Sequence, residues 1–411
     1  MQYNNIMRIS KFTYTLIASI LLLSFWNFRP VVSLLNRDII LVLTLLWTIL
    51  GFCLFPKKLS YRYFHRFNWL WIIFFTGIFI SMLNAYFFWE QPLKTTFIAQ
   101  RFSYTFILLP ALFYVQSSPY DIEKTLRIIS YITLVMWVIS IIRPELIGNI
   151  SEEAIENRNF NPQATTDIGY YVTGIHIVVL YTYFLIQNYI KNFNFKAFLT
   201  ALFWITFIIL YQNRSLIIGI IIIFLYSVIR LKSRHKPIII GCICIIGTIL
   251  ITYTLNIWES LWEESQTQLA DEDYNRWKAL YYYLYDYSPN LWCYLLGNGM
   301  PSGGNSYMGN LMWLNMERGI FTSDLGMIGM WIDYGLLPLI GIYYTLIRLL
   351  IKRYFPLWLK FASFHILLVP TIFQFQQGIG ILFFVLIIYM YVYYRIKHQI
   401  DKKNAQRDSL C

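Results

Sequence analysis

The chain has 411 residues, of which 58% are apolar and only 13% are charged. So few charged residues cannot cover the surface of a soluble domain, and a soluble globular protein is therefore not expected. The formal net charge of +12 does not indicate a nucleic-acid-binding protein, because no compact patch interleaves basic residues with aromatic ones.

Apolar runs follow one another along the whole chain, each long enough to cross roughly 30 Å of hydrocarbon as a helix. The first, FTYTLIASILLLSFWNF, has no small-x-small cleavage site after it and is expected to be retained rather than removed as a signal sequence. The sequence thus predicts an all-α polytopic integral membrane protein with about 12 transmembrane helices. They cover about 12–28, 39–55, 68–88, 97–116, 127–147, 169–190, 196–212, 215–231, 237–256, 324–351, 356–376 and 378–394.

Lys and Arg are distributed unevenly between the two sides of these spans. The connections PKKLSYRYFHRF, IRLKSRHKP and LIRLLIKRY and the tail from Arg395 are basic, whereas most acidic residues fall in the alternate connections. Because basic loops resist translocation, this bias predicts that the amino and carboxyl termini are both cytoplasmic. The positive net charge is therefore a topology signal, and attraction to anionic lipid at the inner face is a second expected effect.

One exported connection is much longer than the others and divides the chain into three parts. We expect spans one to nine in 1–256, a large loop in 257–323, and spans ten to twelve with the cytoplasmic tail in 324–411. Loops of that length are functional or disordered, and the aromatic content of this one argues against disorder. Aromatic and apolar residues at three- and four-residue spacing predict a helix lying on the membrane surface, namely Tyr274, Trp277, Tyr281, Leu284 and Tyr285.

Cysteine and histidine give no sign of a disulfide framework, a metal site or a cofactor. The chain has 5 Cys and 5 His, and Cys293 is the single thiol expected on the exported side. One exported thiol has no partner within the chain, and no histidine falls in the large loop to complete a zinc site.

The segment GNGMPSGGNS, at 297–306, looks like a phosphate-binding loop. A P-loop, however, needs Gly-Lys-Ser/Thr after its glycines, and a dinucleotide fingerprint needs a preceding strand. Two interpretations stay open. The glycines either supply left-handed backbone conformations in a tight turn, or Gly297 and Gly299 bring N–H groups close to an anionic or sugar substrate.

Four arginines are expected on the exported side of the membrane, where the positive-inside rule predicts few basic residues. Arg101 falls inside span four, Arg214 lies in the short connection YQNRSLIIG, and Arg158 and Arg276 lie in the exported loops. Arg101 could instead extend to the interface, and the two loop residues could be ordinary surface charges. Together they predict an anionic partner near the outer leaflet, because guanidinium groups bind phosphate in a bidentate manner.

Four stretches, by their motifs and by their order along the chain, resemble the bacterial O-antigen polymerase and ligase superfamily. NRSLIIG is similar to its Ser-Arg-Gly element, and NRNFNPQ to its Arg-x-x-Gly-x-Phe-x-Asn-Pro-Asn stretch. DYNRWKALYYYLYDYSPNLWCYLLGNG looks like its Arg-containing helix that ends in Gly-x-Gly, and FTSDLGMIGMWIDYGLLP resembles its segment that re-enters the membrane.

The resemblance implies a multi-pass glycosyltransferase of the bacterial inner membrane that polymerises polyprenyl-pyrophosphate-linked oligosaccharide repeat units on the periplasmic face. A polysaccharide chain-length regulator is a possible partner. Ligases of the superfamily carry a histidine near the end of the large loop, where this chain has Ser323 and Asp324. That departure favours a polymerase over a ligase.

The expected chemistry needs cations for the leaving pyrophosphate and a base for the attacking sugar hydroxyl. Arg214 is the expected cation at the reacting centre, and Arg101, Arg158 and Arg276 are expected to help bind the substrate. Asp324 is the expected base, although its position equally suits a helix N-cap. Asp333 is a second candidate for the base.

Two other classes of function stay open. A ligase would transfer the glycan once to a different acceptor, and a flippase or exporter would move the lipid-linked glycan without forming a glycosidic bond. A sugar transferase that uses a polyprenyl phosphate donor normally has paired acids in its first exported loop. The segment FRPVVSLLNRD contains only Asp38, which argues against that class.

Overall fold

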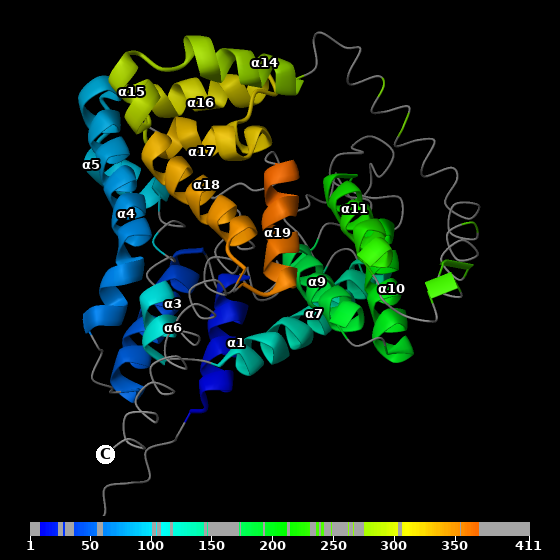
Figure 1. Cartoon of the computed structure of the whole chain (residues 1–411). Coiled ribbons are helices and arrows are strands. Elements are labelled where there is room, and N and C mark those ends of the chain that lie inside the picture. Colours follow the sequence, from blue (N-terminus) through cyan, green and yellow to red (C-terminus); the bar gives the residue numbers. More distant parts are fainter. Residues whose placement is uncertain are drawn as a thin grey trace, which may run out of the picture.

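The computed structural model describes 9–23, 37–55, 61–100, 108–115, 118–143, 174–191, 194–211, 214–230, 275–302, 306–353 and 355–369, with a few single positions between them. Within these ranges the regular elements are helices (Figure 1). The predicted all-helical class is confirmed for this part of the chain. The segments 237–256 and 378–394, predicted as spans nine and twelve, lie almost entirely outside the described residues.

Most of the first helices follow the predicted apolar runs, but the run predicted at 97–116 is described as α-helix only at 97–99 and 108–115. The first helices are α1 (Lys11–Leu22), α3 (Arg37–Leu54), α4 (Tyr61–Trp89), α5 (Leu93–Ala99), α6 (Leu108–Val115) and α7 (Pro119–Ile142). At the start of α7, the Ser118 side chain accepts a hydrogen bond from the Asp121 N–H while the Asp121 carboxylate accepts one from the Ser118 N–H. This capping box satisfies N–H groups that a helix start leaves without partners.

In the part of the chain that the structure describes, two helices are long and apolar enough to cross a membrane by length and composition. These stretches are Ile72–Trp89 within α4 and Tyr120–Ile142 within α7. Several shorter apolar helices accompany them. The structure is thus compatible with a helical membrane protein.

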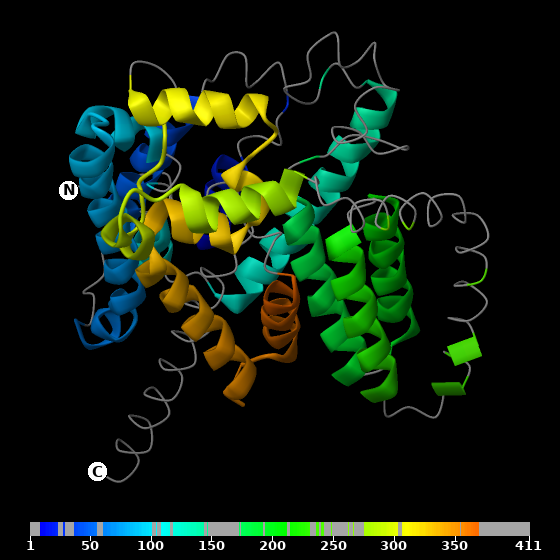
Figure 2. The same ribbon diagram turned by 90° about the horizontal axis from the view of Figure 1, so that it is seen from above.

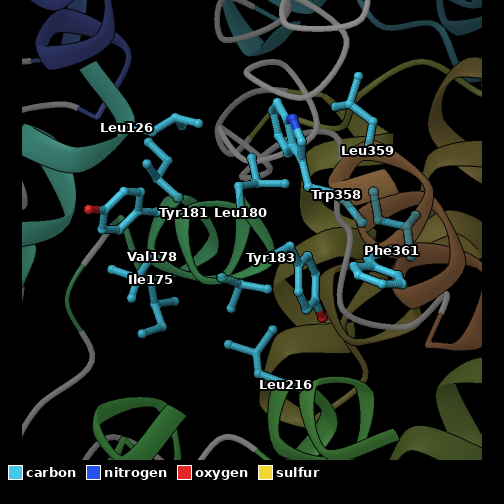
Figure 3. Packing of buried hydrophobic residues seen from close by; sticks show 14 of the residues in the cluster. Leu126, Ile175, Val178, Leu180, Tyr181, Tyr183, Leu216, Trp358, Leu359 and Phe361 are labelled. Carbon is cyan, nitrogen blue, oxygen red and sulfur yellow. The ribbon is translucent and has the colours of Figure 1, made fainter. Parts of the chain in front are cut away.

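A second group of helices packs around α9 (Ile175–Lys191). The group comprises α10 (Phe195–Leu210), α11 (Arg214–Arg230) and α19 (Leu357–Leu368), and α7 packs against α9 as well. Apolar side chains from α9, α11 and α19 meet in its centre, where Tyr183 lies beside Phe361 (Figure 3). The side-chain oxygen of Gln187 accepts a hydrogen bond of 3.2 Å from the Trp358 N–H, which fixes the start of α19 against α9.

Short helices lie across one end of the longer ones. We call them the capping layer: α14 (Asn275–Tyr281), the π-helix η4 (Tyr282–Asp286), α15 (Leu291–Leu296), α16 (Tyr307–Glu317), the 3-10 helix η5 (Thr322–Leu325) and α17 (Met327–Tyr334). Figure 1 shows α14, α16 and α17 stacked above α18 (Leu336–Ile351), and Figure 2 shows α14 and α16 side by side from above. The predicted loop therefore contains helices from Asn275 onward.

The predicted aromatic face of this loop is the outer face of α14 and η4. Trp277, Tyr281 and Tyr285 are exposed, whereas Ala279 and Tyr283 on the opposite face are buried. Tyr274 lies outside the described residues. The three- and four-residue spacing thus predicted a helix correctly. The aromatic face, however, is exposed, and the helix packs through the opposite face.

The predicted span 324–351 is not one continuous helix. It comprises part of η5, then α17 and α18, and the last two meet at Gly335, whose φ is 88°. A Cβ atom on Gly335 would lie 2.4 Å from the carbonyl carbon of Leu296. The chain bends there because it passes the end of α15 at a distance that only glycine permits. With 8 residues, α17 is about 12 Å long and does not span a membrane.

Candidate functional site

The glycine segment Gly297–Ser302 runs from the end of α15 between α4 and the end of α17. Gly297 and Gly299 have φ angles of 91° and 80°, in the left-handed region that L-residues avoid. A Cβ atom on Gly297 would lie 2.5 Å from the nitrogen of Gly335, and one on Gly299 would lie 2.8 Å from the carbonyl oxygen of Ser81. The interpretation of these glycines as a tight turn is confirmed.

The N–H groups of this segment donate hydrogen bonds within the chain. Gly297 donates to the carbonyl of Cys293 (2.9 Å), Asn298 to that of Ile332 (2.8 Å) and Gly299 to that of Asp333 (2.9 Å). The last two bonds satisfy carbonyl groups at the end of α17 that have no partner within the helix. The N–H groups of Gly297 and Gly299 are therefore both used within the chain and are not available to a substrate. We infer that these glycines position the segment and do not bind a ligand through their N–H groups.

Buried polar side chains attach this segment to the first half of the chain. Asn84 donates to the carbonyl of Gly297 (2.8 Å), and the Trp89 indole N–H donates to the side-chain oxygen of Asn298 (3.0 Å). Asn298 in turn donates to the carbonyl of Ile332 (3.0 Å). The end of α4, the glycine segment and the end of α17 are thereby held together.

Gln91, which lies two residues after Trp89 in the turn between α4 and α5, makes a second set of contacts. Its amide nitrogen donates to the carbonyl of Met300 (3.0 Å) and to the hydroxyl of Thr96 (2.7 Å). Its amide oxygen accepts from the N–H of Ser302 (3.1 Å) and from the hydroxyl of Ser306 (3.2 Å). We call Asn84, Trp89, Gln91, Asn298 and Ser306 the polar joint, because together they fasten the α4–α5 turn to the capping layer.

Asp333 lies buried beside the polar joint, in the last turn of α17. Its side chain is 1% exposed, and neither carboxylate oxygen has a hydrogen-bond partner among the described residues. Burial raises the pKa of this carboxyl well above its usual range, because a low-dielectric environment disfavours the charged form.

Tyr283 of η4 and Tyr287, the residue that follows η4, lie near that carboxyl group. Burial is the first cause that raises the pKa of both Tyr283 and Tyr287. The charge of Asp333 is the second cause for Tyr283, and it follows that of Tyr283 for Tyr287. Asn315 is 1% exposed and lies near Tyr282 and Tyr283. Among the described residues, Asp333 therefore lies inside the capping layer, close to the phenols of Tyr283 and Tyr287.

The predicted base, Asp324, is the third residue of η5, and its side chain lies outside the described part. The helix that follows, α17, has Gly326 as its N-cap with no side-chain cap hydrogen bond. The expectation that Ser323 or Asp324 caps a span beginning there is therefore wrong, because the bend at Gly326 starts the helix later. The role of Asp324 as a base stays a prediction.

The predicted arginines are only partly described. Arg276 is exposed on α14, in the capping layer. Arg214 is the first residue of α11, with its side chain outside the described part. Arg101 and Arg158 lie outside it altogether. Whether the four guanidinium groups converge stays a prediction.

A second buried polar group lies among α9, α11 and α19, and sequence reasoning missed it. His365 is 1% exposed, and its Nδ1 is 2.5 Å from the Tyr183 hydroxyl oxygen. A Cβ atom on Gly219 would lie 2.1 Å from Cδ2 of His365, so α11 leaves room for the imidazole. His176, on α9, is partly buried and interacts electrostatically with His365. We call His176, Tyr183 and His365 the histidine–tyrosine cluster.

A sequence signal for this cluster did exist. Ionisable residues inside apolar runs are functional candidates, and His176 and Tyr183 lie two helical turns apart on the same face of one run. The two histidines were instead judged only as metal ligands. Within the described ranges no group of three or more His, Cys, Asp or Glu residues could hold a metal ion.

Comparisons with known proteins were made with family models, curated proteins and solved structures, and none of the three found a match.

Proposed function

We propose that the protein is a membrane glycosyltransferase that joins polyprenyl-pyrophosphate-linked oligosaccharide repeat units into a polysaccharide, as an O-antigen polymerase does. The proposal includes about 12 spans, cytoplasmic termini, a location in the bacterial inner membrane and a capping layer on the periplasmic side. A chain-length regulator is a further proposed partner.

The capping layer is the observation that carries this proposal. It places exposed aromatic side chains, including Trp277 and Tyr281, on the face of α14 that is turned away from α17. Aromatic rings at a membrane surface suit either sugar faces or lipid headgroups. A protein that only moves a lipid-linked glycan across the bilayer has no evident use for such a layer.

The membrane part of the proposal is supported by the surface of the longer helices. Large apolar side chains point outward from them, including Leu46, Phe87 and Ile229, which are 56%, 66% and 71% exposed. Exposed apolar side chains distributed over several helices favour hydrocarbon as the surrounding medium.

The proposed reaction is a displacement at the anomeric carbon of the donor sugar. The acceptor hydroxyl oxygen forms a bond to that carbon while the bond between the carbon and the pyrophosphate oxygen breaks, with inversion if the attack is direct. The pyrophosphate leaves as an anion, and Arg214 with the other predicted arginines would stabilise its charge. A good leaving group of this kind needs no strong general acid.

A base must receive the proton of the acceptor hydroxyl. Burial raises the pKa of Asp333 because it disfavours the charged form, and the side chain is enclosed in the capping layer, where it is 1% exposed. Among the carboxyl groups named, Asp324 therefore stays the first candidate.

Purified protein in liposomes, supplied with a lipid-linked repeat unit, tests the proposal. A ladder of products that differ by one repeat unit is the expected result. A single transfer to a different acceptor would favour a ligase. Movement of the lipid between leaflets with no new glycosidic bond would favour a flippase and contradict the proposal.

A further inference from the structure

The end of the bundle opposite the capping layer carries basic side chains. α18 begins at the capping layer and runs to the opposite end, where α19 starts (Figure 1). The helix ends that meet there carry six basic residues, which we call the basic end: Lys191, Lys196, Arg230, Arg348, Lys352 and Lys360. Each of these six side chains is exposed or half-buried.

A contact between α18 and α19 places the residues of these two helices together. The hydroxyl of Ser363 on α19 donates to the carbonyl of Leu346 on α18 (2.8 Å). The two helices are consecutive and joined by a short connection, so they run in opposite directions. Arg348 and Lys352 lie beyond this contact on α18, and Lys360 lies before it on α19. All three are therefore on the side of the connection, away from the capping layer.

The end of α9 and the start of α10 adjoin the same place. α9 and α19 are antiparallel, and the side-chain oxygen of Gln187 accepts from the Trp358 N–H at the start of α19 (3.2 Å). Lys191, four residues after Gln187, is the last residue of α9 and lies one turn further in that direction. α10 follows, with Asn194 as its N-cap and Lys196 as its second residue. Both lysines are therefore close to the start of α19.

Arg230 is held at this end by an aromatic contact. α11 also runs antiparallel to α19, and Arg230 is its last residue. The Arg230 Nε donates to the Tyr226 hydroxyl (3.1 Å), and its Cζ lies 5.4 Å from the centroid of the Tyr226 ring. That ring packs edge to face on Phe361, the residue after Lys360. Because the hydrogen bond uses Nε, the two terminal nitrogens of Arg230 can pair with a phosphate beside Lys360.

The helices that form the basic end carry no acidic residue. The segments 168–258 and 334–400, which contain α9, α10, α11, α18 and α19, have no Asp or Glu. The helix dipole favours a cation in the last turn, which suits Lys191, Arg230 and Arg348. Lys196 and Lys360, however, lie in first turns, where the dipole disfavours a cation. Helix stabilisation therefore does not account for the whole group, and its mutual repulsion favours a bound anion.

Large apolar side chains stand next to these cations. Phe195, Ile229 and Ile351 are 55%, 71% and 68% exposed, and each is next in the sequence to a residue of the basic end. A free anion would use the charges alone. A lipid with an anionic headgroup uses both, because its phosphate meets the cations while its acyl chains cover the apolar side chains.

We propose that the basic end binds the headgroup of an anionic phospholipid. The phosphate lies between the guanidinium of Arg230 and the ammonium of Lys360, and the acyl chains lie along the apolar side chains beside them. With the predicted topology, this lipid belongs to the cytoplasmic leaflet. Arg214 is at the opposite end of α11, so the inference does not depend on the proposed glycosyl transfer and the bound lipid takes no part in it.

The test is a titration of the purified full-length protein, in a mild neutral detergent, with phosphatidylglycerol or with phosphatidylcholine of the same acyl chains. Phosphatidylglycerol should raise the unfolding temperature in a saturable manner, because a ligand of the folded protein alone stabilises it. Phosphatidylcholine should not. Arg230→Gln combined with Lys360→Gln should raise the phosphatidylglycerol concentration at half of the shift about 25-fold, since each cation near an anionic lipid surface contributes about fivefold.

Lys94→Gln combined with Lys278→Gln is the matched control. It removes two exposed charges from α5 and α14, at the end of the capping layer, and should keep the wild-type response. Equal shifts from the two lipids, or equal losses in the two double variants, would overturn the inference, because hydrocarbon or net charge alone would then explain binding. Inorganic phosphate that displaces phosphatidylglycerol at a similar concentration would show a site for a free anion and overturn the lipid assignment.

Tyr226→Phe decides if the double variant at the basic end fails to fold. This substitution keeps the ring and both charges and removes only the hydroxyl that holds the Arg230 Nε. It should weaken the response to phosphatidylglycerol by a smaller factor than the double variant. A response identical to that of the wild type would overturn the placement of the phosphate at Arg230.

Discussion

The polar joint and the histidine–tyrosine cluster both bury polar side chains, but they use them differently. In the joint, Asn84, Gln91 and Asn298 bond to main-chain groups of distant segments. In the cluster, Tyr183 and His365 bond side chain to side chain between two regular helices. A buried side chain that satisfies a turn or a helix end supports the fold. The Tyr183–His365 pair satisfies neither a turn nor a helix end, so support of the backbone does not explain it.

The largest expected effect on stability comes from the glycine segment. Gly297→Ala should lower the free energy of unfolding by about 3 to 5 kcal/mol, because it combines a strained backbone with a clash against the α17–α18 bend. Denaturant titration in mild detergent measures this change. Gly241→Ala is the control, since a Cβ atom at Gly241 meets nothing within 4 Å. Equal stability of the two variants would contradict the packing described for the segment.

Loss of the Gln91 amide should have an intermediate effect. Gln91→Ala leaves the Met300 carbonyl and the Ser302 N–H without their partner, which should cost about 2 to 3 kcal/mol. Limited proteolysis should then cut the capping layer faster, while the α9–α11 bundle keeps its resistance. Uniform loss of resistance in both regions would show that the joint does not act locally.

The pH dependence that Asp333 adds to stability is the smallest expected effect when it is counted per unit of pH. Its pKa is raised in the folded state, so the folded protein binds a proton that the unfolded chain has lost above pH about 4. The contribution to stability is complete below that pH. It then declines by at most about 1.4 kcal/mol per pH unit until the pH reaches the folded pKa.

Asp333→Asn should remove this decline, because the amide carries no charge in either state. Unfolding of the two proteins, measured from pH 4 to pH 8, should therefore diverge in favour of the variant as the pH rises. Parallel curves would mean that Asp333 is ionised and has a partner in the folded protein.

Local sequence patterns predicted the helices well and the contacts between them poorly. Apolar runs such as 39–55 form helices because backbone N–H and C=O groups need hydrogen-bond partners wherever water is excluded, and a helix supplies them within the run. The turn at Gly297 was one of the two interpretations that the sequence left open, and its positive φ angle agrees with it. The bend at Gly335 was not predicted, since its cause is a close approach to Leu296 that no local pattern records.

The functional candidates differ in the same way. The histidine–tyrosine cluster joins residues 182 positions apart in the sequence, and no spacing rule connects them. Asp333 was named from its place in an apolar run, but its enclosure by η4 and α16 depends on the capping layer. Arg214 could be selected from sequence because its surroundings are local and its sign opposes the positive-inside rule.

Ladder formation by Arg214→Ala, compared with Arg230→Ala, is the most direct test of the proposed polymerase. Both arginines are on α11, at opposite ends, and Arg230 contacts Tyr226. At equal amounts of inserted protein, Arg230→Ala should extend the glycan normally and Arg214→Ala should not extend it. A ladder of normal length from Arg214→Ala would contradict the assignment of this arginine to the pyrophosphate.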